Sequence, residues 1–317
     1  MAWFVARSLT RSGHEVVVFD DRALLTFGFK GNLRAAINRA NLAGWGNPRR
    51  RSLPRAFDQA REGVNLVITV KGESLTADMV SEAATKTPVV NWYSDHPIFD
   101  QQFEVIPAYT LFCPKDSWTT ARLEAMGFRN VVTLPHASAP DLLAPRFPQS
   151  PTHDVSVLGA VYPYRAHWIR ALVDNGYTVS VFGSRIVPSL ASHPKVTWRV
   201  PQARGAAQGD AFRTGRLTLN THHPKDVAGG NARVFDSAAS MTLQLTEDLP
   251  ETAEHLEPNR DFLPFENVEA LLMQVESALA SPSKVSDMAA HAYQEVLAHH
   301  SYERRLQELL GILGLRK

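Results

Sequence analysis

The chain has 317 residues, of which 44% are hydrophobic and 21% are charged, enough for roughly two globular domains. Its 33 Lys and Arg residues balance 32 Asp and Glu residues, so net charge does not favour a nucleic acid or an anionic membrane as partner. The one cysteine, Cys113, cannot form an internal disulfide, and no apolar run approaches the ~20 residues that span a bilayer. These features predict a cytoplasmic protein without a transmembrane segment.

The first half of the sequence alternates between helical and strand patterns. Residues Ala2–Arg11 form an amphipathic pattern that predicts a helix ending before Gly13, and the apolar run Glu15–Phe19 predicts a buried strand. Further runs of strand length follow, separated by helical or polar sequence, at Leu66–Val70, Val89–Trp92, Thr110–Phe112 and Val131–Leu134. Such alternation predicts a parallel sheet with helices around it.

A proline-rich stretch interrupts this pattern between Pro135 and Thr152, and five prolines without periodicity are typical of a crossing between domains. We therefore predict an N-terminal domain over residues 1–148, a C-terminal domain over 149–284 and a helical tail over 285–317. The second domain repeats the alternation, with strands predicted at Asp154–Leu158, Thr178–Phe182, Val196–Val200, Leu217–Asn220 and Leu243–Thr246. Ligands of such sheets bind at the carboxyl ends of the strands.

The most informative loop follows the predicted strand that ends at Asn220. It contains Gly229 and Gly230, and Asn231 is a good N-cap for the helix that we expect to start there. Free backbone N–H groups and the helix dipole favour a phosphate at such a point, and the two glycines would let it approach closely. The alternative is an ordinary mobile loop before a capped helix.

Two charged residues in the first turns of this helix strengthen the phosphate interpretation. Arg233 has the planar fork that binds phosphoryl oxygens, and Asp236 is expected to accept hydrogen bonds from ribose hydroxyls. Arg165 and Gly183 follow two other predicted strands, and both are expected to face the same ligand. An ordinary surface position remains the alternative for each of them.

In the first domain, the predicted strand near Val89 ends in the neighbouring residues Asp95 and His96. A carboxylate or an imidazole at that place suits a general base that deprotonates an acceptor hydroxyl. Alternatively, Asp95 caps a turn and His96 is solvated. The sequence contains no GxSxG, GxxxxGK[ST] or HExxH string, so it does not favour a hydrolase triad, a P-loop or a zinc protease, and we expect no metal site.

Several short motifs resemble the spore-maturation CgeB-type glycosyltransferase-like family, which is related to the GT-B glycosyltransferases. They occur in the order expected for that family along nearly the whole chain, and they are Gly13–Val16 with Asp20, Trp92–Pro97, Asn231–Asp236, Leu243–Glu247, Phe262–Leu271 and the terminal His300–Arg305. The last of these matches the pattern H-[ST]-Y-x-x-R.

The resemblance implies an α/β fold of the GT-B type, in which two Rossmann-like doubly wound domains face each other across a cleft. It further implies a metal-independent glycosyltransferase, with a UDP-, GDP- or dTDP-linked sugar donor on the C-terminal domain. A protein, glycan or small-molecule acceptor would bind to the N-terminal domain, and the helical tail would pack back toward that domain. By position, Asn231 and Arg233 would meet the diphosphate, Asp236 the ribose, and Asp95 would lie near the reaction centre.

Departures from the family pattern leave other functions open. Because Met1 falls within the first expected helix, we expect the first domain to lack its first strand. The acidic residue that retaining enzymes often carry has no counterpart at Ala228 or Gly229, which favours an inverting reaction. The alternatives are a catalytically impaired module that binds a nucleotide or a glycan, and a sugar-nucleotide epimerase.

Overall fold

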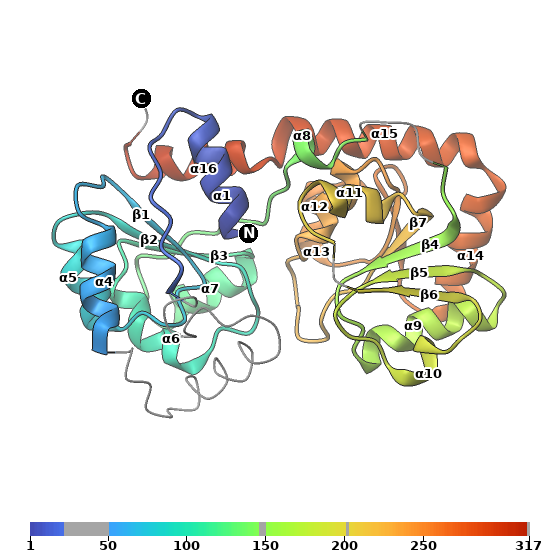
Figure 1. Cartoon of the computed structure of the whole chain (residues 1–317), viewed down its shortest axis with the longest axis horizontal. Coiled ribbons are helices and arrows are strands. Elements are labelled where there is room, and N and C mark those ends of the chain that lie inside the picture. Colours follow the sequence, from blue (N-terminus) through green and yellow to red (C-terminus); the bar gives the residue numbers. More distant parts are fainter. Residues whose placement is uncertain (22–50, 146–149, 201–202, 316–317) are drawn as a thin grey trace. The chain divides into compact units, whose positions relative to one another are not determined.

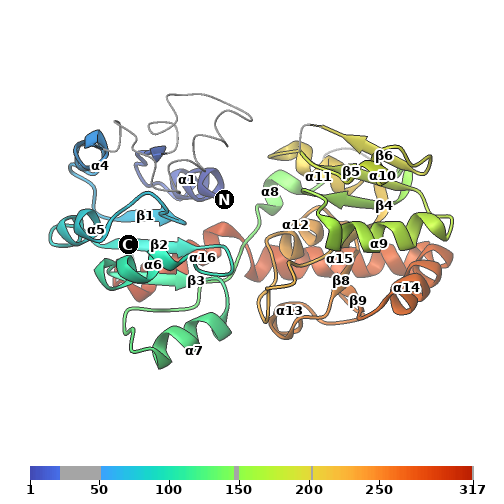
Figure 2. The same cartoon turned by 90° about the horizontal axis from the view of Figure 1, so that it is seen from below.

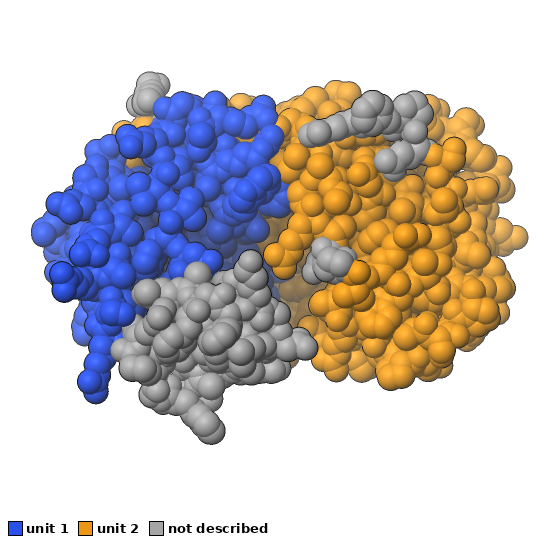
Figure 3. Space-filling model, in the orientation of Figure 1, with its two compact units in different colours: residues 1–115, 119–134 blue, residues 116–118, 135–317 orange. Residues whose placement is uncertain are grey.

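The computed structural model describes residues 1–21, 51–145, 150–200 and 203–315 (Figure 1). Contacts divide the chain into two compact units, which Figure 3 shows in different colours. Unit 1 comprises Met1–Lys115 and Thr119–Leu134, and unit 2 comprises Asp116–Trp118 and Pro135–Lys317. Unit 2 thus starts before residue 148, the boundary that we predict from the sequence, and it includes the helical tail.

Unit 1 contains a parallel sheet of three described strands, β1 (Val67–Val70), β2 (Val89–Tyr93) and β3 (Leu111–Pro114), in the order β1-β2-β3. Every residue of the middle strand β2 is buried, as expected for a strand covered on both faces. The helices that accompany this sheet are α1 (Ala2–Arg11), α4 (Leu53–Ala60), α5 (Ala77–Ala84), α6 (Asp100–Val105), the 3-10 helix η2 (Ile106–Ala108) and α7 (Ser117–Ala125).

Two strands predicted for the first half differ in the structure. Residues 15–19 form no strand, and Val17 and Val18 are 59% and 70% exposed, because this apolar run pairs with no described strand. The run predicted from Val131 forms an isolated bridge with Phe112 of β3, and Val132 and Leu134 donate backbone hydrogen bonds to carbonyls of β3, but the run forms no regular strand. Whether an apolar run joins a sheet depends on the partners that its backbone groups find, which local sequence does not report.

Unit 2 contains a six-stranded parallel sheet in the order β6-β5-β4-β7-β8-β9. Its strands are β4 (His153–Leu158), β5 (Val179–Phe182), β6 (Val196–Arg199), β7 (Gly215–Asn220), β8 (Gln244–Glu247) and β9 (Phe262–Phe265). The chain builds outward from β4 to β6, then returns to the other side of β4 and builds outward again from β7. The order therefore reverses between β4 and β7, and in open α/β sheets a crevice for ligands forms at the carboxyl ends of such a pair.

Helices cover both faces of the six-stranded sheet, with α9 and α10 on one side and α11 and α12 on the other (Figures 1 and 2). The helices of unit 2 are α8 (Pro140–Leu143), α9 (Pro163–Asp174), α10 (Pro188–Ala191), α11 (Ala206–Phe212), α12 (Arg233–Ala239), α13 (Pro250–His255), α14 (Val268–Ala280), α15 (Pro282–His299) and α16 (Tyr302–Ile312). Apolar clusters fill both faces: Val155 and Val157 pack with Ile169 of α9, whereas Phe235 of α12 packs with Val296 of α15. None of the helices in the described ranges is long and apolar enough to cross a membrane.

Candidate functional site: two arginines at the switch point

The turn after β4 brings Arg165 to the carboxyl edge of the sheet. Gly159 ends the strand with a φ of 106°, a left-handed value that favours glycine, and Pro163 occupies the first turn of α9. The Arg165 Nε donates to Thr221 Oγ1 at 2.9 Å, and Nη2 donates to the Thr221 carbonyl at 3.1 Å. Its Nη1 donates to the Ala160 carbonyl at 2.8 Å. The guanidinium therefore bridges the loops that follow β4 and β7.

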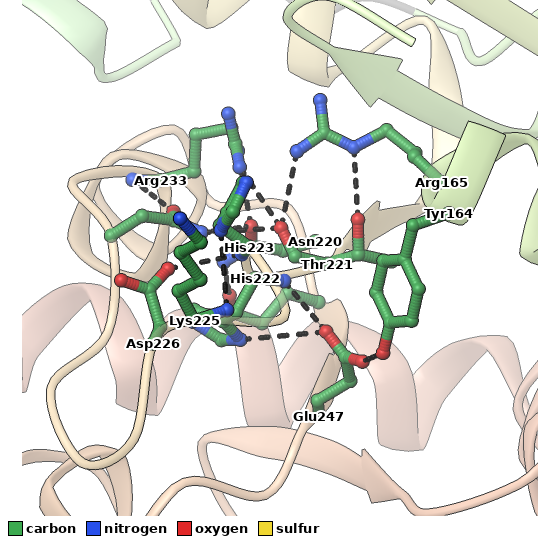
Figure 4. Close-up of polar contacts among 12 residues, drawn as sticks. Tyr164, Arg165, Asn220, Thr221, His222, His223, Lys225, Asp226, Arg233 and Glu247 are labelled. Carbon is green, nitrogen blue, oxygen red and sulfur yellow. Dashed lines mark hydrogen bonds and ion pairs between the residues drawn. The ribbon is translucent and has the colours of Figure 1, made fainter. Parts of the chain in front are cut away.

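Arg233 reaches the same place from the loop after β7. Its Nε donates to Asn220 Oδ1 at 3.0 Å, and its Nη2 donates to the Thr221 carbonyl at 3.0 Å. Because this carbonyl also accepts from Arg165, the two Nη2 nitrogens lie within about 6 Å of each other. Figure 4 shows the hydrogen bonds of both arginines meeting at Thr221.

Gly159 lies against both guanidinium groups. A Cβ atom added to it would be 3.0 Å from Arg233 Nη1 and 3.1 Å from Arg165 Nη1. A side chain at this position would thus push the arginines apart or close the space beside them. The left-handed backbone and the crowding both require glycine here.

The charges of the two guanidinium groups act on each other at short range. Within the described part of the chain, no carboxylate lies at ion-pair distance from Arg165 or Arg233. Burial lowers the pKa of Arg165 to about 10, and the charge of Glu247 partly opposes this effect. Burial also lowers the pKa of Arg233 well below its ordinary value, and the charge of Arg165 lowers it further. An anion bound here would relieve the repulsion and supply acceptors for free N–H groups.

Asn231 orients Arg233 and does not cap the helix in the predicted way. Helix α12 begins at Arg233, and the N-cap position is taken by Ala232, which has no capping side chain. The Asn231 Oδ1 accepts the Arg233 backbone N–H at 3.0 Å, and its Nδ2 donates to Asn220 Oδ1 at 3.0 Å. Since an Asn side chain readily bonds the backbone two residues ahead, it forms a turn before the helix rather than capping it.

The predicted glycines have a packing role that the sequence does not reveal. A Cβ on Gly229 would lie 2.5 Å from the Cβ of Asp116, and one on Gly230 would lie 2.8 Å from a methyl group of Val234. The space beside both residues is therefore filled by this chain's own atoms. Likewise, a Cβ on Gly183 would lie 2.2 Å from the Gly159 carbonyl oxygen, so Gly183 lets the end of β5 pass beneath the turn after β4.

Asp236 is a buried carboxylate and not a surface residue, since it is only 7% exposed. One oxygen accepts from the Ser138 hydroxyl and the other from Gln208 Nε2, both at 2.7 Å. Burial raises the pKa of Asp236 to about 6, although these two hydrogen bonds and the charge of Arg233 favour its ionised form. Because a carboxylate oxygen has two lone pairs, each oxygen can accept one more hydrogen bond.

Asp95 and His96 belong to unit 1, where they follow the carboxyl end of β2. Asp95 forms an ion pair with Lys71, which follows the neighbouring strand β1. The Nδ1 of His96 and the hydroxyl oxygen of Thr119 are 3.5 Å apart. Lys71 is absent from the sequence-based site because its position depends on parallel pairing of β1 with β2 and on a left-handed backbone, with φ of 69°.

Glu247, the last residue of β8 and of the motif Leu243–Glu247, was not predicted as a site residue from the sequence. Glu247 accepts the backbone N–H of His222 at 2.6 Å and the hydroxyl of Tyr164, as Figure 4 shows. Burial and, to a smaller extent, the hydrogen bond to the Glu247 carboxylate raise the pKa of Tyr164 to about 12. Glu247 could have been found from its place directly after an apolar run, where side chains reach the ligand edge of a sheet. Thr221 was not found, because the carbonyl that both arginines share can be supplied by any residue type, and only the bond from Arg165 Nε uses the threonine side chain.

None of the described residues forms a group of three or more His, Cys, Asp or Glu side chains that could hold a metal ion.

Comparison with protein families matches residues 165–311 to a family described as glycosyl transferase-like. This segment includes Arg165, Asn220, Thr221 and Arg233. Comparison with curated proteins gave no match.

Solved structures resemble the chain over most of its length at low sequence identity. Sucrose-phosphate synthase from Thermosynechococcus elongatus has a TM-score of 0.67 at 12% identity, over 98% of this chain and 91% of that one. Anabaena HepE in complex with UDP-glucose has a TM-score of 0.63 at 11% identity, over 90% of each chain. TarM has a TM-score of 0.63 at 11% identity over 84% of this chain, which spans only 58% of the TarM chain. The chain therefore has the α/β fold of the GT-B type, with parallel sheets flanked by helices.

Proposed function

We propose that this chain with a GT-B fold is a glycosyltransferase that moves a sugar from a nucleoside diphosphate donor to an acceptor hydroxyl. One observation carries the proposal: Arg165 and Arg233 share the Thr221 carbonyl at the β4–β7 switch point, and neither forms an ion pair with a carboxylate among the described residues. Two adjacent guanidinium groups match the two charged phosphates of a diphosphate better than they match a neutral ligand.

In the proposed reaction, the arginines act on the leaving group. Negative charge grows on the diphosphate as the bond between the anomeric carbon and the phosphate oxygen breaks. Arg165 and Arg233 are already held in place by Thr221 and Asn220, so they stabilise this charge without reorganising. This is the work that a divalent cation does in metal-dependent transfer, and we propose a metal-independent reaction.

Asp236 is proposed to recognise the donor's ribose. A carboxylate whose oxygens each retain a lone pair can accept hydrogen bonds from two neighbouring hydroxyls. Because HepE was solved with UDP-glucose, a UDP-sugar is the first donor to test, followed by GDP- and dTDP-sugars. Gly183, Gly229 and Gly230 are proposed to shape the surrounding loops, given the crowding at each of them.

For the acceptor side, we propose a single displacement with inversion. The acceptor oxygen attacks the anomeric carbon, the diphosphate departs with the bonding electron pair, and the acceptor's proton passes to a general base. Asp95 or His96 is the proposed base, and the variants Asp95→Asn and His96→Gln test them separately. The variant that lacks the base is expected to lose sugar transfer but to keep donor binding.

The donor site is tested by titration calorimetry with UDP-, GDP- and dTDP-sugars and with inorganic pyrophosphate. We expect Arg165→Ala and Arg233→Ala each to weaken binding at least about tenfold, since each removes a charge-assisted contact. Arg170→Ala is the matched control, because Arg170 lies on the same helix as Arg165 but is exposed and donates to Ser189. The proposal would be contradicted if the unmutated chain and the three variants bound equally well, or if the unmutated chain bound none of the nucleotide sugars.

Product analysis separates the alternatives to transfer. Release of nucleoside diphosphate that depends on an acceptor supports a glycosyltransferase. Donor binding without turnover over hours would indicate a binding module, and conversion of the donor sugar without an acceptor would indicate an epimerase.

A further inference from the structure

Ser138, which no sequence pattern predicts as a site residue, forms backbone hydrogen bonds with the terminal motif His300–Arg305. Ser138 is fully buried, its N–H donates to the His300 carbonyl at 2.9 Å, and its carbonyl accepts the Tyr302 N–H at 2.9 Å. His300 and Tyr302, at the junction between α15 and α16, thus fix the backbone of Ser138. With its backbone fixed, the direction of its hydroxyl is restricted.

The junction is in turn held by side chains of the motif. Arg305 Nη2 donates to His300 Nδ1 at 2.9 Å, and His300 Nε2 lies 3.1 Å from the His255 carbonyl. The His300 ring stacks on Phe235, with 4.9 Å between ring centroids. Phe235 directly precedes Asp236, so the motif contacts both Ser138 and the helix that carries the carboxylate.

The Ser138 hydroxyl donates to Asp236 Oδ1 at 2.7 Å, and Gln208 holds the other oxygen at the same distance. One donor on each oxygen fixes the plane of the carboxylate and leaves the remaining lone pairs in defined directions. A carboxylate with a single donor would rotate more freely about its side-chain bonds. The pair of donors therefore preorganises Asp236 before a ligand arrives.

We propose that Ser138, braced by the His300–Arg305 motif, is a positioning residue that aims the Asp236 carboxylate at the ribose hydroxyls of the donor. This proposal rests on the proposed function, because it takes Asp236 as the ribose acceptor. It assigns to the motif a role in recognising the nucleoside rather than the diphosphate. Nothing in it requires Ser138 to touch the donor.

The test compares the affinity for UDP with that for inorganic pyrophosphate, which has no ribose. We expect Ser138→Ala to weaken UDP binding about tenfold, the effect of a lost hydrogen bond to a charged group, and to leave pyrophosphate binding unchanged. Ser138→Thr keeps the hydroxyl and is expected to restore UDP affinity. Ser240→Ala is the matched control, because Ser240 is a buried serine that directly follows α12 and its hydroxyl donates to the Ser237 carbonyl, not to the Asp236 carboxylate.

A double-mutant cycle with Asp236→Asn shows whether Ser138 acts through the carboxylate. We expect Ser138→Ala to weaken UDP binding no further in the Asp236→Asn background. Three results would overturn the inference: unchanged UDP affinity in Ser138→Ala, equal weakening of UDP and pyrophosphate, or full additivity in the cycle. Failure of the proposed function looks different, because the unmutated chain would then bind neither UDP nor pyrophosphate.

Discussion

Acidification from about pH 7.5 to about pH 5 is expected to destabilise unit 2 through two imidazoles, the partly buried His255 and the buried His300. Burial, together with the charge of Arg305, lowers the pKa of His255 to about 4 and that of His300 to about 3. The rings contact each other edge to face, and His300 also stacks on Phe235. Both are therefore neutral in the folded chain at pH values where an exposed histidine is charged.

The sign follows from proton binding. An unfolded histidine has a pKa near about 6.5, so below this pH the unfolded chain binds protons that the folded chain does not. The stability that the two neutral histidines contribute is therefore present above about pH 6.5, and it is lost as the pH falls toward their pKa values in the folded chain. At about pH 5 each histidine lowers the free energy of unfolding by about 2 kcal/mol, and the pair lowers it by about 4 kcal/mol.

Urea denaturation followed by circular dichroism at the two pH values measures this loss. His300→Gln removes one of the two titrating rings. Between the two pH values, the unfolding free energy of this variant is expected to fall by only about 2 kcal/mol, against about 4 kcal/mol for the unmutated chain. His299→Gln is the matched control, since His299 is the neighbouring residue and is exposed, and it is expected to keep the full pH dependence. An equal pH dependence of the unfolding free energy in the unmutated chain, His300→Gln and His299→Gln would refute a contribution from His300.

Three further predictions concern the loops at the strand ends. Gly183→Ala forces a Cβ against the Gly159 carbonyl at 2.2 Å, so it is expected to lower the unfolding free energy by about 2 kcal/mol or more, measured by denaturation. A stable variant would show that the turn after β4 moves freely. Asn231→Asp adds a negative charge beside the two guanidinium groups, and calorimetry should find pyrophosphate bound at least about tenfold more weakly; unchanged affinity would place the anion elsewhere. Lys71→Met breaks the half-exposed pair with Asp95 and is expected to change the unfolding free energy by less than about 1 kcal/mol, and a larger change would mean that the pair is a core element.

Much of the architecture was predictable because it depends on local periodicity. Apolar runs of strand length alternate with amphipathic segments, and this pattern identified the eight strands β1 to β8 to within a few residues. Short motifs in the expected order indicate a glycosyltransferase-like family, and the match of residues 165–311 to a glycosyl transferase-like family agrees with this at the coarser level. Arg165 and Arg233 were predictable as neighbours because both follow strand ends, and parallel strands end at one edge.

The chemistry of each candidate residue was decided by contacts across the chain. The sequence alone identifies Asp236 as a helix residue, but its burial and its bonds to Ser138 and Gln208 come from segments 98 and 28 residues away. Lys71 meets Asp95 only because β1 and β2 pair. The glycines were predicted as access for a ligand, yet the atoms that crowd them belong to the chain itself.

The sequence by itself determined most of the helices and strands, and it placed both arginines after strand ends, at the starts of the helices that follow. It does so because backbone geometry repeats every two or 3.6 residues and leaves its period in the side chains. Only the tertiary structure decided that Arg165 and Arg233 share the Thr221 carbonyl, which any residue type could supply. It also decided that β4 and β7 are neighbours. Strand order and backbone hydrogen bonds depend on packing between distant segments, and this packing leaves no local pattern.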